Sequence, residues 1–167
     1  MPKDDSSEFI LENVRQPSRP ERIEQAVNLW LAEGVLAPEE ARRRSAELLM
    51  VAVKREDGSV MGVCTTYLDT PVALRMPMWC FRTFVAKSCR QQNVALRLLL
   101  AARDFHEQQF VSGADTSGRG LYMEIENLII QKHRNEAVWL RSKMVFIGFN
   151  ARGDHCRAYY FPGARVS

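Results

Sequence analysis

One segment of this chain has the residue types and spacing of an anion-binding turn. Residues 85–95 form a polar turn between an apolar run at residues 79–85 and a helical pattern at residues 94–109. A turn that leads into a helix exposes backbone N–H groups that have no acceptor inside the helix, and the helix dipole makes that end positive. The segment therefore predicts a cradle for a phosphate group, with Arg90 at its centre as a further positive charge.

A second segment carries paired carboxylates. Glu124 and Glu126 alternate with apolar residues in the strand-like run at residues 121–127. Because side chains along a strand point to alternate faces, we expect both carboxylates on the same face. A carboxylate there can accept a proton from a substrate ammonium, directly or through water. A partly exposed polar strand face is the other interpretation of the same pattern.

The composition is that of an ordinary globular protein. The chain has 167 residues, of which 46% are apolar and 26% are charged, and its net charge is +3. This length predicts one domain at residues 9–167, after a flexible polar tail at residues 1–8. The excess of positive charge is too small to indicate a nucleic-acid partner, although it favours an anionic ligand. The basic run at residues 42–44 is interpreted as a solvated helix face rather than a nucleic-acid patch.

The cysteines and the apolar runs bear on the cell compartment. The four cysteines form no CxxC pair, so we expect no metal site. They are interpreted as reduced thiols packed as small apolar side chains, and a nucleophilic Cys80 or Cys89 would need a nearby histidine base. No stretch has the pattern of a signal peptide or the length of a membrane span. The expected location is therefore the cytoplasm, without a membrane partner.

Hydrophobic periodicity and turn residues predict a mixed order of strands and helices. Strands are expected at residues 9–14, 48–53, 60–67, 78–85, 121–127, 145–150 and 156–161. Helices are expected at residues 20–33, from Pro38 onward, and at residues 94–109 and 135–143, with a hairpin turn at Asp57 and Gly58. This order predicts an α/β (α+β) fold with a single mixed, mostly antiparallel central sheet of six to seven strands flanked by about four helices.

The anion-binding turn resembles the acyl-CoA-binding loop of the GCN5-related N-acetyltransferases (GNAT). That family has Arg/Gln-x-x-Gly-x-Gly/Ala after a strand that ends in Val, and the matching residues are Val85, Arg90, Asn93 and Ala95. Asn93 stands where the family has Gly. Since Asn is the residue that next best tolerates a positive φ and is a favoured helix N-cap, the turn can keep its shape. The predicted order of elements is also that of the GNAT fold, so the resemblance covers almost the whole chain.

The resemblance implies a donor and a set of donor-binding residues. Acetyl-CoA would be the cosubstrate, and Phe84 and Val85 would offer backbone groups to its pantetheine arm and thioester. The loop amides would hold the pyrophosphate. Those loop residues are Arg90, Gln91, Gln92, Asn93, Val94 and Ala95. The acceptor would be a primary amine on a small molecule or a protein, attacking directly in a ternary complex.

A second, weaker match lies near the end of the chain. The family often has Ala-x-x-Leu-Tyr-x-Lys-x-Gly-Phe where its last helix meets the sixth strand. Here Ala137, Leu140, Lys143 and Phe146 match, Arg141 replaces the Tyr and Val145 replaces the Gly. That Tyr is the usual proton donor to the leaving sulfur. Because Arg stays protonated, Arg141 can only stabilise a thiolate by charge or bind a phosphate.

The resemblance also locates the remaining catalytic groups. The family's active site is the gap between its fourth and fifth strands, which implies that Glu124 or Glu126 is the general base. Tyr122, Tyr159 and Tyr160 remain alternative proton donors.

Two other functions stay open at this point. The departures at Asn93 and Arg141 also suit a non-catalytic acyl-CoA-binding or interaction domain on the same fold. A third possibility is an acyltransferase that uses an acyl carrier protein or an aminoacyl-tRNA as donor, with residues 42–44 and Arg90 facing the polyanion. The acceptor amine and a homodimer through the apolar last strands are left undecided by the sequence.

Overall fold

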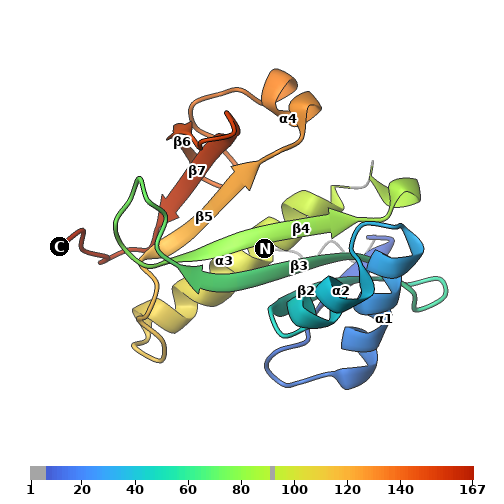
Figure 1. Cartoon of the computed structure of the whole chain (residues 1–167). Helices are drawn as coiled ribbons and strands as arrows, with labels where there is room; N and C mark the ends of the chain where they lie inside the picture. Colours follow the sequence, from blue (N-terminus) through green and yellow to red (C-terminus); the bar gives the residue numbers. More distant parts are fainter. Residues whose placement is uncertain (1–6, 91–92) are drawn as a thin grey trace. The chain divides into compact units, whose positions relative to one another are not determined.

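The structure is a computed structural model that describes residues 7–90 and 93–167. Within these residues one seven-stranded mixed sheet has the order β1-β2-β3-β4-β5-β7-β6 (Figure 1). The strands are β1 Phe9–Asn13, β2 Leu48–Lys54, β3 Val60–Asp69, β4 Met78–Val85, β5 Gly120–Ile125, β6 Val145–Phe149 and β7 His155–Tyr160. The helices are α1 Pro20–Ala32, α2 Pro38–Ser45, the 3-10 turn η1 Lys87–Cys89, α3 Val94–Val111 and α4 Leu128–His133. The predicted fold class is confirmed.

The chain divides into two compact units. Unit 1 contains residues 7–66, 83–90 and 93–102 of the described chain, and unit 2 contains residues 67–82 and 103–167. Strands β3 and β4 and helix α3 contribute residues to both units. The single domain expected at residues 9–167 stays a prediction, and each unit is described by itself.

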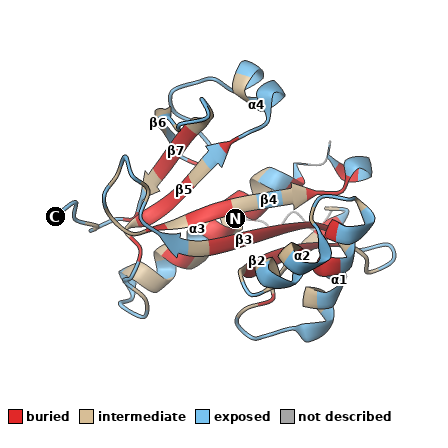
Figure 2. Ribbon diagram, viewed as in Figure 1, coloured by how far each residue is buried: buried red, intermediate tan, exposed pale blue. Residues whose placement is uncertain are grey.

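Unit 1 is built on the antiparallel strands β1, β2 and β3 and on helices α1 and α2. Both helices begin with a proline at the first turn, where its missing N–H costs nothing, and Gly34 with φ 65° follows the end of α1. Figure 2 shows the buried residues running along β2 and β3. The core contains Val14, Ala26, Val27, Trp30, Ala41, Leu48, Val51, Val53 and Val63.

The guanidinium of Arg15 adds hydrogen bonds to unit 1 outside its strand ladders. Arg15 Nη2 donates to the carbonyl oxygens of Glu47 at 2.6 Å and Thr66 at 2.8 Å. Its Nε donates to the carbonyl oxygen of Leu48 at 3.2 Å. Burial lowers the pKa of Arg15. One side chain therefore ties the segment after β1 to the start of β2 and to β3.

Unit 2 is built on β5, which pairs with β7 along its whole length, and on β6 at the edge beside β7 (Figure 1). A small core covers one face of these strands. It contains Met78, Cys80, Tyr122, Cys156 and Ala158. On β4, Trp79 alternates with Met78 and Cys80 and stacks on the buried ring of His106 from α3, with 4.2 Å between ring centroids.

The helix predicted at residues 135–143 is wrong. The last helix, α4, lies earlier in the chain, and the side chain of Asn127 caps it by accepting hydrogen bonds from the N–H groups of Ile129 at 2.9 Å and Ile130 at 3.3 Å. The predicted strand at residues 121–127 accordingly ends at Ile125. Figure 2 shows that α4 is largely exposed.

Residues 134–144 form a compact turn because a buried side chain takes their carbonyl groups. Arg157 is 1% exposed, and its guanidinium donates to the carbonyl oxygens of Arg134, Glu136 and Ala137 at 3.2, 2.8 and 3.5 Å. The same guanidinium lies 4.1 Å from the centre of the Trp139 ring. In the same segment the N–H of Phe146 donates to the carbonyl oxygen of Ala137 at 2.8 Å and the N–H of Trp139 to that of Met144 at 2.9 Å, which are not helical pairs.

The four cysteines are free thiols and all four are buried. Burial raises the pKa of both Cys64 and Cys80 to about 12, so neither is a thiolate near neutral pH. Among the described residues no group of His, Cys, Asp and Glu side chains has the arrangement of a metal site. No helix in the described part of the chain is long and apolar enough to cross a membrane.

Replacing Arg157 tests its part in unit 2. Arg157→Met keeps a similar length but removes the donor to the carbonyl oxygen of Glu136 and one of the two donors to those of Arg134 and Ala137, so we expect the free energy of unfolding to fall by about 1–3 kcal/mol. Urea unfolding followed by circular dichroism measures this change. Arg165→Met, at an exposed position, is the matched control and should stay within about 0.5 kcal/mol of the parent. Equal stability of both variants would contradict the assigned role.

Candidate active site

The predicted anion-binding turn of unit 1 is described on both sides of residues 91 and 92. Strand β4 ends at Val85, η1 follows, and Asn93 adopts a positive φ of 56° immediately before α3. The N–H of Arg97 donates to the carbonyl oxygen of Asn93 at 3.1 Å. The N–H groups of residues 94–96 therefore precede the first intrahelical bond and are the donors that a helix N-terminus offers to an anion. The expectation that Asn93 can take the glycine conformation is confirmed.

Arg90 stands at the exposed side of this turn. Its Nε donates to the carbonyl oxygen of Val85 at 3.4 Å, and its guanidinium carbon lies 6.0 Å from the centre of the Phe84 ring. These contacts hold the charge beside the end of β4 while leaving it accessible to solvent. Gln91 and Gln92, the two other polar residues predicted to bind the donor, lie outside the described residues.

A glycine that the sequence did not single out sets the position of α3. A Cβ atom on Gly62 of β3 would lie 2.9 Å from Val94 Cγ1, 3.4 Å from Leu98 Cδ1 and 3.4 Å from the carbonyl oxygen of Phe84. Because a side chain would push these atoms away, Gly62 allows the first turns of α3 to pack directly on β3. Val94 is 1% exposed as a result, whereas Ala95 faces solvent.

In unit 2, Glu124 belongs to a hydrogen-bonded group on one face of β5 and β7. The Tyr122 hydroxyl donates to Glu124 Oε1 at 2.9 Å and lies 3.3 Å from Cys156 Sγ. Cys156 is the register partner of Glu124, so the side chains of the two residues share a face. Burial, followed by the hydrogen bonds to Cys156 and Glu124, raises the pKa of Tyr122. Its hydroxyl therefore stays protonated and orients Glu124.

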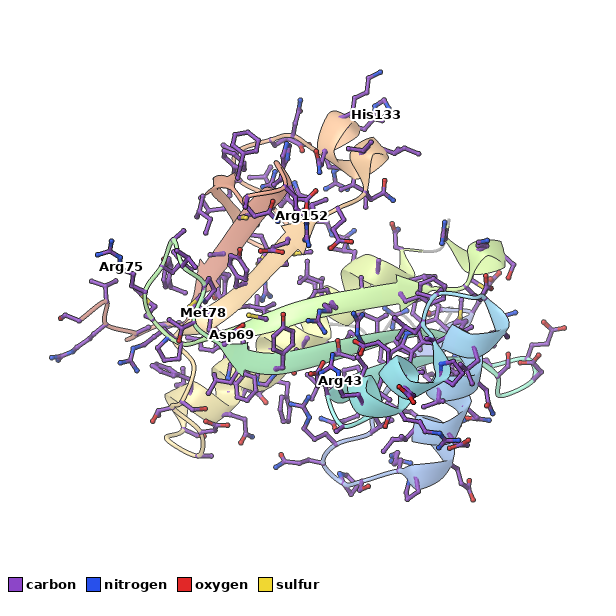
Figure 3. The ribbon with its side chains drawn as sticks, in the orientation of Figure 1. Arg43, Asp69, Arg75, Met78, His133 and Arg152 are labelled. Atoms are coloured by element: carbon purple, nitrogen blue, oxygen red, sulfur yellow. The ribbon has the colours of Figure 1, made fainter. Side chains whose placement is uncertain are left out.

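The turn between β6 and β7 supplies the countercharge. Arg152 Nη2 lies 3.3 Å from Glu124 Oε2 and 3.0 Å from Glu126 Oε1, and its Nε lies 3.0 Å from Asp154 Oδ2. Figure 3 labels Arg152 close to the end of β5. The side chain of Glu124 is 36% exposed and that of Glu126 is 74% exposed. The structure thus brings both predicted carboxylates to one guanidinium, with Glu124 more firmly held.

Arg141 does not join this group. It is exposed in the turn before β6, where its carbonyl oxygen accepts a long hydrogen bond of 3.4 Å from Arg103. Among the contacts of the described residues none connects its guanidinium to Glu124 or Glu126. The motif that suggested Arg141 falls in the segment that is not helical, so Leu140 is 77% exposed instead of packed.

The three alternative tyrosine donors occupy different positions. Tyr159 is adjacent to Ala158, the register partner of Tyr122, so it points to the opposite face of β7. There its hydroxyl donates to Glu107 at 2.6 Å, and burial together with this bond raises its pKa to about 12. Tyr160 is 42% exposed. Tyr122 is therefore the tyrosine whose hydroxyl contacts Glu124.

The parallel pairing of β4 with β5 is short. Register partners in the described residues of these two strands are Trp79 with Leu121 and Cys80 with Tyr122. Beyond Tyr122, β5 continues to Ile125 in its ladder with β7.

Solved acetyltransferases share this fold. An acetyltransferase of the GNAT family from Streptococcus pneumoniae aligns with a TM-score of 0.61 at 13% identity, over 92% of this chain and 99% of that one. Ribosomal-protein-S5-alanine acetyltransferase from Vibrio fischeri aligns with a TM-score of 0.64 at 9% identity, over 95% and 96% of the two chains. Arabidopsis thaliana NAA60 in complex with acetyl-CoA aligns with a TM-score of 0.61 at 13% identity, over 92% and 99%.

These likenesses define the class of fold. No protein-family model matches the chain, and no curated protein sequence matches it. The chain has the fold of the GNAT superfamily, as its sequence pattern predicted.

The conformation of Asn93 leads to a prediction about stability. Asn93→Val places a β-branched side chain at φ 56° and should lower the free energy of unfolding by about 1–2 kcal/mol. Asn93→Gly removes the steric cost of this φ but makes the unfolded chain more flexible, so it should stay within about 1 kcal/mol of the parent. Thermal unfolding of the three proteins measures both changes. A valine variant as stable as the parent would show that the turn does not need this conformation.

Proposed function

We propose that the protein is an acyl-CoA-dependent N-acyltransferase that transfers an acetyl group from acetyl-CoA to a primary amine. The observation that carries the proposal is the turn after β4, where Asn93 takes the glycine conformation and presents the start of α3 beside Arg90. Its occurrence within the GNAT fold supports the assignment, as does the acetyl-CoA bound to NAA60, which has the same fold.

The donor-binding residues then have distinct roles. The amides at residues 94–96 bind the pyrophosphate through their N–H groups and the helix dipole, and Arg90 adds a charged contact from the exposed side. Phe84 and Val85 at the end of β4 offer backbone groups to the pantetheine arm. Gln91 and Gln92 remain proposed members of this loop.

The transfer needs an unprotonated amine. Glu124 takes the proton from the substrate ammonium, the amine nitrogen forms a bond to the thioester carbonyl carbon, and the carbon–sulfur bond breaks. The electron pair of that bond leaves with the thiol as a thiolate, which then gains a proton. Tyr122 holds Oε1 of Glu124 at 2.9 Å, which supports Glu124 over the more exposed Glu126 as the base.

The proton donor to the leaving thiolate is not assigned to one residue. Arg141 stays a proposed source of positive charge for the thiolate, although its exposed position gives it no contact with the Glu124 group. A thiolate of ordinary basicity can be protonated by water, so the proposed reaction needs no dedicated acid. The acceptor is proposed to be a small-molecule or protein amine.

Charge reversal at Arg90 tests the loop. Arg90→Glu places a negative charge beside the pyrophosphate and should weaken acetyl-CoA and CoA binding by about 10- to 100-fold. Isothermal titration calorimetry of the purified protein measures both affinities. Arg42→Glu, an equal charge change on the exposed surface of α2, should leave them unchanged. If parent and Arg90→Glu bind CoA equally, the loop does not hold the pyrophosphate.

Calorimetry together with a thiol-release assay separates the alternative functions. A non-catalytic binder would take up CoA but release no thiol with any amine. A donor on a carrier protein or tRNA would give weak CoA binding and salt-sensitive binding to the macromolecule.

Removing the base tests the mechanism. Glu124→Gln should lower kcat/KM for the amine by about 10²- to 10⁴-fold near neutral pH, since the ammonium must then lose its proton unaided. For the same reason the pH optimum should move upward. Thiol release measured over about four pH units, from roughly pH 6 to 10, gives both quantities, because this range suits a carboxylate base and an amine acceptor. Glu126→Gln is the matched control and should keep most of the activity. A pH profile identical to the parent's in Glu124→Gln would remove Glu124 from the mechanism.

A further inference from the structure

Helix α4 of unit 2 presents large apolar side chains to solvent. Leu128, Ile129 and Ile130 are consecutive in the chain, and they are 75%, 70% and 38% exposed. The pale blue of α4 in Figure 2 marks this exposure. Single exposed apolar residues are ordinary on a protein surface, whereas a contiguous group of them indicates a surface that binds a partner.

Hydrogen bonds fix α4 to the end of β5. The side chain of Asn127 caps the first turn of the helix. The side-chain amide of Gln131 donates to the carbonyl oxygen of Ile125 at 2.6 Å. The N–H of Arg134 closes the last turn on the carbonyl oxygen of Ile130 at 2.8 Å. The apolar side chains are therefore exposed by a helix that is held at both ends.

The chain that connects α4 to β6 adds further exposed apolar residues. Val138 is 41% exposed, Leu140 is 77% exposed, and Val145 at the start of β6 is 41% exposed. The indole N–H of Trp139 donates to the carbonyl oxygen of Arg134 at 2.9 Å, which ties the connection to the end of α4. In Figure 1 α4 and this connection lie at the same end of unit 2. We call the exposed residues between 128 and 145 the α4–β6 surface.

The α4–β6 surface also carries the net positive charge of the chain. The chain has 23 basic and 20 acidic residues, of which four and one lie in this segment, so 19 of each lie outside it. The net charge of +3 is therefore concentrated at residues 128–145. All five charged side chains are exposed, and the acidic one lies 3.9 Å from a neighbouring cation. They are Lys132, Arg134, Arg141, Lys143 and Glu136.

The combination of apolar and cationic side chains limits what this surface can bind. A nucleic acid would pair with the cations but would leave the apolar side chains in water. A second copy of the chain, joined through the same surface, would bring two surfaces of net positive charge together. The surface of an anionic lipid bilayer suits both features. Apolar side chains enter the boundary between headgroups and acyl chains, while lysine and arginine approach the anionic headgroups.

We propose that the α4–β6 surface binds the protein reversibly to the surface of an anionic lipid membrane. Leu128 and Ile129 enter the boundary below the headgroups, and Lys132 and Lys143 approach the anionic headgroups. The expectation of no membrane partner rested on the lack of an apolar run long enough to span a bilayer, and binding at the surface needs no such run. The inference is independent of the proposed acetyl transfer, because membrane binding is measured without acetyl-CoA or an amine.

Vesicle flotation tests the proposal directly. The purified full chain is mixed with vesicles of phosphatidylcholine alone, or of phosphatidylcholine and phosphatidylserine at a molar ratio of about 2:1, which have a negative surface potential. We expect flotation with the anionic vesicles and not with the neutral ones. Raising the salt from about 0.1 M to about 1 M should weaken binding, because the Debye length falls from about 10 Å to about 3 Å. A protein that does not float with the anionic vesicles overturns the proposal.

A pair of charge variants assigns the binding to this surface. Lys132→Glu should weaken binding to the anionic vesicles by about 10- to 30-fold, because it replaces an attraction to the headgroups with a repulsion. Arg165→Glu, an equal change of charge at another exposed position of unit 2, should have little effect. Equal losses in the two variants would mean that net charge alone causes binding, which contradicts the assignment.

A pair of double variants tests the apolar contribution. Leu128→Ser with Ile129→Ser should weaken binding by about 10- to 100-fold, since two apolar side chains no longer leave water. The control is Val72→Ser with Val166→Ser, which changes two residues of unit 2 that are 92% and 75% exposed. This control should bind as the parent does, and circular dichroism checks that both proteins are folded. Unchanged binding in the α4 variant would show that α4 does not enter the membrane.

An inserted indole provides a readout that does not depend on weakened binding. Ile129→Trp places the indole on α4, and brominated phosphatidylcholine in the anionic vesicles quenches an indole that enters the acyl boundary. We expect additional quenching relative to the parent for Ile129→Trp and none for Val72→Trp. A protein that floats without additional quenching at position 129 binds by another surface, and the proposal is then wrong.

Light scattering tests the competing occupant. The parent should be no more associated than the double variant Leu128→Ser with Ile129→Ser in the absence of vesicles. A parent dimer that this variant converts to a monomer would overturn the proposal, because a second copy of the chain would then cover the α4–β6 surface.

Discussion

In each unit a guanidinium supplies hydrogen-bond donors to three backbone carbonyl groups, and much of the local chain path depends on this interaction. Arg15 serves the carbonyls of Glu47, Leu48 and Thr66 in unit 1. Arg157 serves three carbonyls of the turn at residues 134–144 in unit 2. A buried carbonyl without a donor costs about 1–3 kcal/mol, so donors of this kind stabilise these turns. In unit 2 that turn leads directly into β6, and the turn between β6 and β7 carries Arg152.

The same interaction explains which parts of the fold could be predicted. The strands and the first three helices depend on local periodicity, on prolines at helix starts and on Gly34, all of which are visible in the sequence. The last helix depends on a competition that is not local. Residues 135–143 have a helical pattern, yet Ala137 and Trp139 pair with Phe146 and Met144, and Arg157 from a later strand donates to the carbonyls of Glu136 and Ala137. The cap that starts α4, Asn127, was instead assigned to the end of a strand.

The candidate site was likewise only partly predictable from the sequence. The conformation of Asn93 followed from its place in a motif, and the shared face of Glu124 and Glu126 followed from strand alternation. Neither principle could find Arg152, because the sequence marks its segment only as a turn and its reach to β5 depends on strand pairing. Gly62 was equally hidden, since its role lies in what a side chain would displace. Local patterns therefore located the proposed reacting groups but not the residues that contact them.

The buried cysteines can report how the protein unfolds. Cys64 and Cys89 belong to unit 1, and Cys80 and Cys156 belong to unit 2. A buried thiol reacts with an alkylating reagent only when the structure around it opens, so each unit carries two internal reporters. The rates at which the four thiols become modified thus distinguish a molecule that unfolds as one cooperative body from one whose units unfold separately, without any engineered label.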